Sequence, residues 1–224
     1  MQTVYYILMR KLSASLLLPL LMVFLLPPAQ AQQPAPLRAT IQDSHEGMTI
    51  GIDPWTQASQ YKERFPKKSP FSKGIVALRV SFRNDSNEGI KIDLRHIRLL
   101  LQLSEEERQE LEPLTADEVA DAVMLKNNGK DPTARRVPLP IPIGGAKPSR
   151  DKNWTDFRDD CQNAGVPSSV VAAHGTVEGL LYFDLRGEVE LLQKARLYVP
   201  NLAFMGTRQP LSYFDIPLGG SATN

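Results

Sequence analysis

The chain contains little that would support covalent or metal-dependent chemistry. It has a single cysteine, so no disulfide can form within one chain. Its 26 Lys and Arg residues nearly balance its 25 Asp and Glu residues, which excludes the broad positive surface typical of nucleic-acid-binding proteins. It also lacks a serine-nucleophile elbow, a paired-histidine zinc motif, a phosphate-binding loop and a dinucleotide-binding glycine pattern. None of these common enzyme classes is therefore indicated.

Histidines and carboxylates are too scattered to predict a metal site or an acid–base pair. The three histidines fall at turns or strand ends: His45, His96 and His174. A metal site needs at least three converging ligands, so we expect no metal and no other cofactor. The acidic runs at 105–107, 117–118 and 159–160 are typical of solvated surface. A glycosidase, by contrast, needs two acids held across a cleft.

The single cysteine is predicted to be structural. Asp159 and Asp160 directly precede Cys161, and negative charge near a thiol raises its pKa. A reactive nucleophile is therefore disfavoured, and a disulfide between two chains is the alternative.

A long hydrophobic run occurs only near the N-terminus. Residues 16–26 (LLLPLLMVFLL) follow the positive charges of Arg10 and Lys11, and Ala29-Gln30-Ala31 then supplies small residues at a cleavage site. This order of charge, apolar run and small residues predicts that residues 1–31 are a signal peptide.

The predicted leader sets the expected location of the protein. Its apolar run is shorter than the roughly 20 residues that span a bilayer, so we expect no stable transmembrane span after cleavage. The mature protein is expected to be extracytoplasmic, either periplasmic or secreted, and an uncleaved N-terminal anchor is the alternative. Translation from Met1 or from Met9 would give the same mature product.

The mature chain is long enough for one sizeable domain. It would contain 224 minus 31, or 193, residues, and 24 basic against 25 acidic residues give it a net charge of −1. A chain of this length can bury an adequate core. We expect a flexible lead-in over 32–36, a single domain over 37–218 and a disordered tail over 219–224.

Alternating apolar and polar residues predict about eight β-strands. The clearest strand covers 75–83, where apolar residues at even positions point to one face and Arg79, Ser81 and Arg83 point to the other. The remaining strands are expected near 37–41, 48–52, 90–94, 97–103, 109–113, 176–185, 194–200 and 211–217. This succession predicts a mainly β protein with an antiparallel β-sandwich, and a small closed barrel is the alternative.

Two short helical insertions interrupt the strands. Thr115 to Leu125 begins with a capping box of Thr115 and Glu118. Trp154 to Ala164 forms a second predicted helix within an insertion at about 125–167. In the same insertion, residues 137–143 carry proline at every second position, which predicts a polyproline II stretch or an edge strand.

The loop over residues 55–73 is the predicted binding surface. It interleaves aromatic and basic residues, of which we single out Trp55, Tyr61, Arg64, Phe65, Lys67, Lys68 and Phe71. Aromatic faces with cations suit stacking on sugars or bases and pairing with anions. Outside the cytoplasm, the expected partner is an envelope protein or an anionic glycan. Alternatively, the aromatic residues close one end of the sandwich and the lysines keep the loop soluble.

Two segments also carry a family resemblance. Residues 74–92 contain a strand, an Asn-Asp-Ser turn and a second strand. Residues 173–185, with 195–200 after them, contain a late strand with spaced glycines and a phenylalanine. Over about half of the mature chain, this resembles the immunoglobulin-like domains of uncharacterised bacterial exported proteins and lipoproteins. The resemblance implies an immunoglobulin-like sandwich and export, and it implies no catalytic residues.

The chain departs from that family in its insertion at 125–167 and in lacking a lipid-attachment cysteine. We expect an exported, non-catalytic immunoglobulin-like domain that acts by binding. One alternative is an envelope hydrolase whose site is built around the insertion. Another is a carrier of a small apolar ligand, which would need an enclosed cavity of several hundred Å³ between the sheets.

Overall fold

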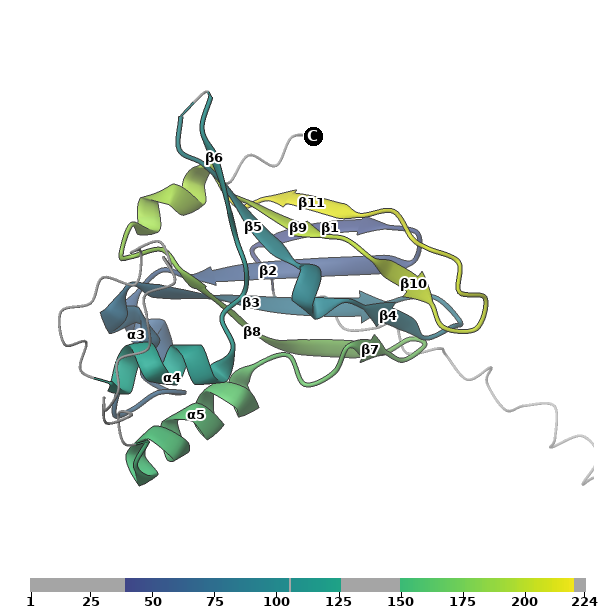
Figure 1. The fold of residues 1–224 in the computed structure, drawn as a ribbon. Coiled ribbons are helices and arrows are strands. Elements are labelled where there is room, and N and C mark those ends of the chain that lie inside the picture. The colour runs from purple at the N-terminus through teal and green to yellow at the C-terminus, as the bar shows by residue number, and fades with distance from the viewer. Residues whose placement is uncertain (1–38, 105, 126–149, 220–224) are drawn as a thin grey trace, which may run out of the picture. The chain divides into compact units, whose positions relative to one another are not determined.

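A computed structural model describes residues 39–104, 106–125 and 150–219. These residues form eleven strands in a mainly antiparallel β-sandwich with a few short helices (Figure 1). The predicted mainly β fold class is therefore confirmed, whereas the immunoglobulin-like assignment stays a prediction. The expected signal peptide, the lead-in and the proline-alternating segment at 137–143 lie outside the described residues.

The first layer of the sandwich is a sheet with the strand order β1-β2-β3-β8, in which all neighbours are antiparallel. Its strands are β1 (Ile41–His45), β2 (Met48–Trp55), β3 (Ile75–Asn84) and β8 (Thr176–Asp184). The strands expected near 37–41 and 48–52 correspond to β1 and β2, which form an antiparallel hairpin, although β1 lies at 41–45. Glu46 and Gly47 alone therefore connect the two strands, with φ values of 51° and 78°. Two central residues with positive φ give the strand twist that a hairpin requires.

The second layer consists of two short sheets, β10-β4-β7 and β11-β9-β5-β6. Their strands are β4 (Ile90–Ile92), β5 (Arg98–Gln102), β6 (Arg108–Leu111), β7 (Val170–Val171), β9 (Arg196–Val199), β10 (Leu202–Phe204) and β11 (Phe214–Pro217). Two continuous stretches of chain pass from one of these sheets to the other: β4 leads into β5, and β9 leads into β10. Between the paired residues Ile92↔Leu202 and Arg98↔Tyr198, the stretch from β4 to β5 advances six residues, whereas the stretch from β9 to β10 advances four. The additional residues of the first stretch are accommodated in a 3-10 helix at Leu94–His96.

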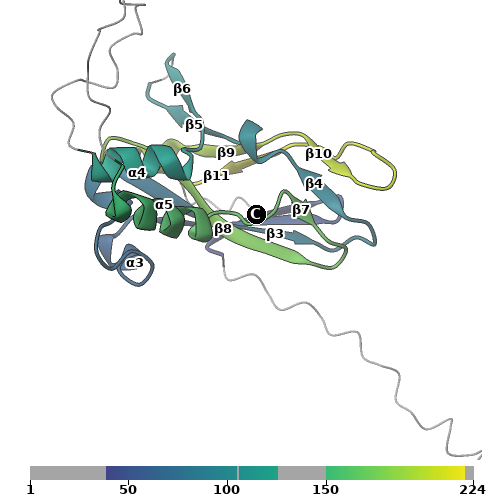
Figure 2. The ribbon, with the colours of Figure 1, turned by 60° about the horizontal axis from the view of Figure 1, so that its bottom comes forward.

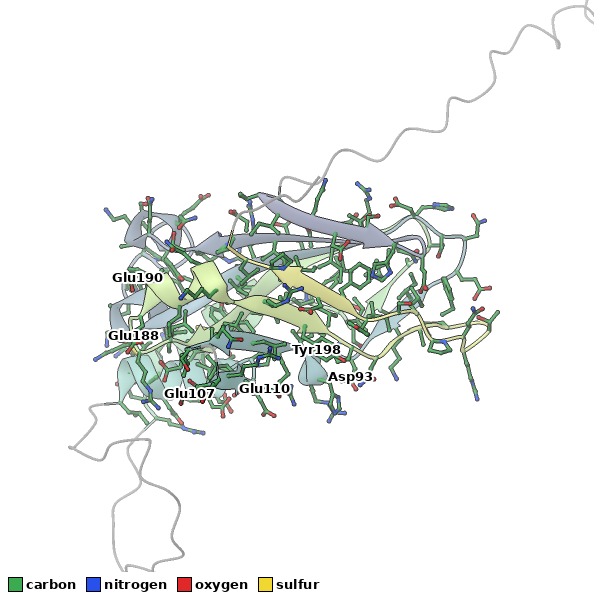
Figure 3. All side chains as sticks on the ribbon, turned by 90° about the horizontal axis from the view of Figure 1, so that it is seen from above. Asp93, Glu107, Glu110, Glu188, Glu190 and Tyr198 are labelled. Atoms are coloured by element: carbon green, nitrogen blue, oxygen red, sulfur yellow. The ribbon has the colours of Figure 1, made fainter. Side chains whose placement is uncertain are left out.

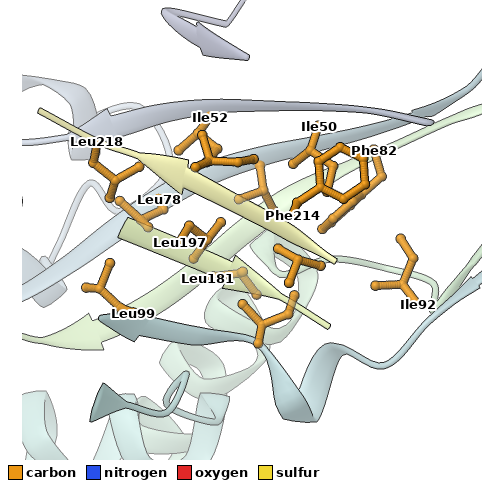
Figure 4. Packing of buried hydrophobic residues seen from close by; sticks show 14 of the residues in the cluster. Ile50, Ile52, Leu78, Phe82, Ile92, Leu99, Leu181, Leu197, Phe214 and Leu218 are labelled. Atoms are coloured by element: carbon orange, nitrogen blue, oxygen red, sulfur yellow. The ribbon is translucent and has the colours of Figure 1, made fainter. Parts of the chain in front are cut away.

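The first hydrophobic core fills the space between the two layers. Ile50, Leu78 and Phe82 of the first layer pack with Leu197 and Phe214 of the second (Figure 4), and all five side chains are fully buried. The alternation that predicted β3 therefore identified the inner face of that strand correctly.

Helices cover one end of the outer face of the first layer (Figure 2). Two of them, α4 (Ala116–Met124) and α5 (Lys152–Ala164), pack against each other. The predicted capping box of Thr115 and Glu118 begins α4. The loop over 55–73 adds the short α3 (Ala58–Tyr61) and a 3-10 helix at Pro70–Lys73, and another 3-10 helix lies at Val189–Lys194. No helix in the described part of the chain is long and apolar enough to cross a membrane.

The helices bury a second core against the first layer. Ile75 and Ala77 belong to the outer face of β3, yet they are 1% and 0% exposed. They pack with the inward faces of α4 and α5 and with residues of the 55–73 loop. Further along the same face, Arg79 and Arg83 are only partly buried. The outer face of β3 thus changes from apolar to charged halfway along the strand.

Gly179 of β8 lies directly beneath the chain that leaves α5. Gly165 forms a parallel bridge with Leu180, and a Cβ on Gly179 would lie 2.4 Å from both the Gly165 carbonyl oxygen and the Val166 nitrogen. We expect Gly179→Ala to lower the free energy of unfolding by about 1–3 kcal/mol, the usual effect of overpacking, in denaturant titrations. Gly89→Ala is the control, because its Cβ would meet nothing closer than 3.6 Å. Equal losses in the two variants would contradict this close crossing.

Glu46 connects the end of the first hairpin to the second layer. Its carboxylate accepts hydrogen bonds from the backbone N–H and the hydroxyl of Ser212, each at 2.8 Å. These bonds, the backbone bond foremost, lower the pKa of Glu46 below its ordinary value. Beside it, the His45 ring stacks on Phe214 with the ring centroids 3.7 Å apart.

The lowered pKa of Glu46 predicts a loss of stability in acid. A carboxyl whose pKa is lower in the folded state stabilises the fold above its unfolded pKa, and this contribution is lost as the pH falls further. We therefore expect the wild type to lose thermal stability below about pH 4.3 more steeply than Glu46→Gln does. The two melting-temperature curves should converge in acid, and parallel curves would show that the bonds to Ser212 contribute nothing.

Candidate functional site

The structure buries two of the aromatic residues that were predicted to contact a ligand. Tyr61 and Phe65 are 0% and 4% exposed and belong to the second core. The Tyr61 hydroxyl accepts a hydrogen bond from the Ala77 backbone N–H and donates one to the Trp55 carbonyl, each at 2.8 Å. Burial raises the pKa of the Tyr61 phenol far above its ordinary value. At this burial the two rings are not available to stack on a ligand. They attach the loop to β3, in agreement with the alternative that the aromatic residues of the loop pack inside the protein.

The other predicted residues of the loop keep some exposure. Trp55 is half-buried, and its ring is nearly perpendicular to that of Tyr61, at an interplanar angle of 84° and a centroid distance of 5.2 Å. Phe71 is also half-buried and packs against both cores, with its ring centroid 5.4 Å from that of Tyr61. Three basic residues are exposed: Arg64, Lys67 and Lys68. Apart from Phe71, these residues are divided between two separate hollows.

The first hollow, which we call the Trp55 hollow, lies where the loop, the end of α5 and the outer face of the first layer meet. Its volume is about 510 Å³, within the range of small-molecule sites. It is lined by Trp55, Gln60, Glu63, Arg64, Arg79, Asn163, Ala164, Gly165, Pro167, Glu178, Gly179 and Leu180. The close crossing of Gly165 over Gly179 forms part of its wall.

Two arginines give the Trp55 hollow fixed polar groups. Arg64 donates from Nη2 to the Asn163 carbonyl at 2.9 Å, which uses one of the five N–H donors of a guanidinium. Arg79 donates from Nη2 to Asp53 at 2.9 Å, and its Nε lies 3.7 Å from Glu178. The two arginines and the two glutamates of the lining balance in charge.

This combination suits a ring that is apolar on one side and polar at its rim. An indole has a flat apolar face with a negative π-surface, and Trp55 lines the hollow while staying partly exposed. Guanidinium, carboxylate and amide groups around it supply both hydrogen-bond donors and acceptors. A saccharide ring has the matching chemistry, since its C–H groups form an apolar face and its hydroxyls both donate and accept.

The second hollow, the Trp154 hollow, receives the two lysines of the loop. Its volume is about 460 Å³. It is lined by Phe65, Pro66, Lys67, Lys68, Met124, Leu125, Asp151, Asn153, Trp154, Asp156, Phe157 and Asp160. Three aspartates outnumber the two lysines, so an anion would meet net negative charge there. Leu125 on its rim adjoins residues 126–149, which the structure does not describe.

The carboxylates of the two hollows are not arranged as a general acid requires. Glu63 and Glu178 of the Trp55 hollow are both exposed, whereas a general acid at neutral pH is held in an apolar setting. The Trp154 backbone N–H lowers the pKa of Asp151, which is the direction opposite to that of an acid catalyst. These exposed carboxylates do not have the apolar setting of a general acid.

The histidines are used in local contacts far from the hollows. The His96 ring bonds to Asp93 at 2.8 Å, and the His174 ring bonds to Asn87 at 2.9 Å. His174 itself has a positive φ of 54°, which fits its predicted turn position. In the described part of the chain, no group of three or more His, Cys, Asp or Glu side chains could hold a metal ion.

The sequence did not identify the partners that complete the Trp55 hollow. Asn163 lies 99 residues from Arg64, and no local pattern connects α5 with the loop. Arg79 was recognisable as an outward-facing strand residue, and Glu178 as part of the strand expected near 176–185. Their proximity became visible only through the register of β3 with β8, in which Arg79 pairs with Leu180 and Ser81 pairs with Glu178.

Cys161 faces the second core from α5 and is 1% exposed. Burial, with a contribution from the charge of Asp160, raises the pKa of its thiol to about 12. The folded protein should therefore react with a disulfide reagent at pH 8 at least about a thousandfold more slowly than the protein in denaturant, where the thiol pKa returns to about 8.5. Asp160→Asn should barely change the native rate, because burial dominates. Similar rates in native and denatured protein would contradict the buried placement.

No protein-family model matches the chain, and no curated protein matches it. Among solved structures, the chain is similar to a functionally unknown protein from Listeria monocytogenes, with 15% sequence identity, coverage of 80% of each chain and a TM-score of 0.36. A similarity of this size carries no functional argument, so the function must be argued from the residues of the site.

Proposed function

We propose that the protein is an exported, non-catalytic β-sandwich domain that binds a glycan through the Trp55 hollow. The observation that carries this proposal is the half-buried Trp55 ring beside Arg64 in a hollow of about 510 Å³.

Electrostatics favour a neutral or weakly charged glycan. Glu63 and Glu178 offset the charges of Arg64 and Arg79 in the lining, so a densely charged polymer would gain little net attraction. The anionic glycan expected from the sequence would depend on the unused donors of Arg64. A neutral acetamido sugar would need only the indole face and ordinary hydrogen bonds.

The proposed location depends on the predicted signal peptide at residues 1–31. An extracytoplasmic domain meets envelope or extracellular polysaccharide directly, which agrees with the chemistry of the hollow. An envelope protein is the other partner class expected from the sequence. It is less favoured because the hollow is polar and small, whereas protein interfaces centre on larger apolar contacts.

The other two functions considered from the sequence receive less support. A hydrolase would need one carboxyl kept protonated near neutral pH, and the acids of the hollow are exposed. A carrier of an apolar ligand would need space between the sheets. Side chains of the first core occupy that space, including Leu78, Phe82 and Phe214 at 0% exposure.

Binding to two defined saccharides tests the proposal. The probes are β-1,4-linked N-acetylglucosamine oligomers, which are neutral, and oligogalacturonate, which is anionic, measured by calorimetry with the full mature chain. We expect one of them to bind. We expect Trp55→Ala to weaken that binding by at least about tenfold, equivalent to 1.4 kcal/mol, because the stacking face is lost.

The matched control uses the other hollow. Lys67→Ala and Lys68→Ala alter the same loop but line the Trp154 hollow, so they should leave saccharide affinity unchanged. Failure of both probes to bind, or full affinity in Trp55→Ala, would show that the proposed function is wrong. Loss of affinity in the lysine variants alone would show that the saccharide binds in the Trp154 hollow and not in the Trp55 hollow.

A further inference from the structure

A third hollow lies on the outer face of the second layer. Its volume is about 340 Å³, and it shares no lining residue with the two hollows at the loop. We call it the Lys194 hollow, and its lining includes Leu100, Gln102, Arg108, Lys194, Arg196 and Asp215. These side chains are exposed or partly exposed, whereas Leu99 and Leu197 on the opposite face of the same strands are fully buried. The hollow is therefore open to a ligand from outside.

Three cations from different elements meet at the Lys194 hollow. Arg108 of β6 stands across from Gln102 of β5, and its Nε donates to the Gln102 side-chain oxygen at 3.0 Å. Arg196 of β9 donates from Nε to Asp215 at 2.7 Å, so the carboxylate of the lining is already engaged. Within the residues that the structure describes, neither Arg108 nor Lys194 is ion-paired. The centre of the hollow therefore carries excess positive charge and unused hydrogen-bond donors.

Carboxylates flank this positive centre on two sides. One pair belongs to β6 and the residue before it, and the other pair belongs to the start of the 3-10 helix that ends at Lys194. All are exposed and none lines the hollow: Glu107, Glu110, Glu188 and Glu190. In Figure 3 the four acids lie on the same face of the molecule as Tyr198. A chain of anions would meet these acids, so the charges favour a single anion that carries a positive group beside it.

A pair of tyrosines adjoins the positive centre. Tyr198 follows Arg196 by two residues on the outward side of β9, which places their Cα atoms about 7 Å apart. The Tyr213 ring lies beside it, with a centroid distance of 5.4 Å and an interplanar angle of 52°, and Tyr213 is 60% exposed. The charge of Arg98, across from Tyr198, is offset by Glu112 at 2.8 Å. Two aromatic rings set at an angle attract an ammonium group.

We propose that this face binds a zwitterionic phosphate ester, whose phosphate enters the Lys194 hollow and whose ammonium group lies against Tyr198 and Tyr213. Guanidinium and lysine donors form charge-assisted hydrogen bonds with phosphate oxygens. The flanking acids attract the positive end of the ligand and repel a second anion. Choline and ethanolamine phosphodiesters have this chemistry, either as free esters or as lipid headgroups. The site is independent of glycan binding in the Trp55 hollow.

A zwitterion and its two halves provide the test. Glycerophosphocholine, choline and glycerol 3-phosphate are each titrated into the ¹⁵N-labelled mature chain at low salt, and affinities are taken from the amide shifts. Glycerophosphocholine should bind at least about tenfold tighter than either half, equivalent to 1.4 kcal/mol, and should shift the Gln102 side-chain amide. Lys194→Ala should weaken the binding of glycerophosphocholine and of glycerol 3-phosphate. Tyr213→Ala should weaken only the binding of glycerophosphocholine.

Lys91→Ala is the matched control, because Lys91 is an exposed lysine of β4 in the second layer that does not line the hollow. It should leave all affinities unchanged, as should Trp55→Ala, which separates this site from the proposed function. Absence of binding, equal affinity for glycerophosphocholine and glycerol 3-phosphate, or full affinity in both Lys194→Ala and Tyr213→Ala would overturn the site. Glycan binding would still be decided by its own probes.

Vesicles distinguish the two sources of the ligand. If the soluble ester binds and phosphatidylcholine vesicles do not sediment the protein, the ligand is a free ester. If these vesicles also sediment the protein, and Lys194→Ala abolishes this, the ligand is a lipid headgroup. Either result supports the site. Sedimentation with phosphatidylglycerol vesicles alone would contradict it, because that headgroup has no ammonium group.

Discussion

Strand β3 must satisfy two different environments along a single face, and the candidate site depends on where they meet. Its inner face is apolar throughout and belongs to the first core. On its outer face, Ile75 and Ala77 require cover, whereas Arg79 and Arg83 require water or ion-pair partners. The helices can therefore cover only the first half of that face, because burying an arginine without compensation is costly. The Trp55 hollow lies at this boundary.

The close crossing at Gly165 and Gly179 keeps the boundary in place. Since Gly179 has no Cβ, the chain leaving α5 can contact the β8 backbone directly. Arg64 then attaches the 55–73 loop to the end of α5 through the Asn163 carbonyl. The hollow is thus bounded by backbone and by side chains with fixed partners, which reduces the entropy lost when a ligand binds.

Much of the scaffold could be predicted from local sequence. Alternation over 75–83 identified the inner face of β3, and Thr115 with Glu118 identified the start of α4. The two-residue β7 and the three-residue β10 were missed, since Val170-Val171 and Leu202-Ala203-Phe204 do not alternate apolar with polar residues as the equally short β4 does. Burial of Tyr61 and Phe65 was one of two alternatives that the sequence left open. Interleaved aromatic and basic residues look the same whether the rings face a core or a ligand, and only the position of α5 decides between these cases.

The central claim is that a saccharide contacts Trp55, and the composition of the chain allows a direct measurement. The chain has only two tryptophans, Trp55 and Trp154, so a ¹⁵N-labelled sample gives two indole N–H signals. The Trp154 signal is an internal reference, because its indole is 6% exposed and donates to Asp121 at 2.9 Å. On titration with the saccharide probe that binds, the account predicts a shift of the Trp55 indole signal and a constant Trp154 signal. A constant Trp55 signal at saturation, or a shift of Trp154 alone, would contradict it.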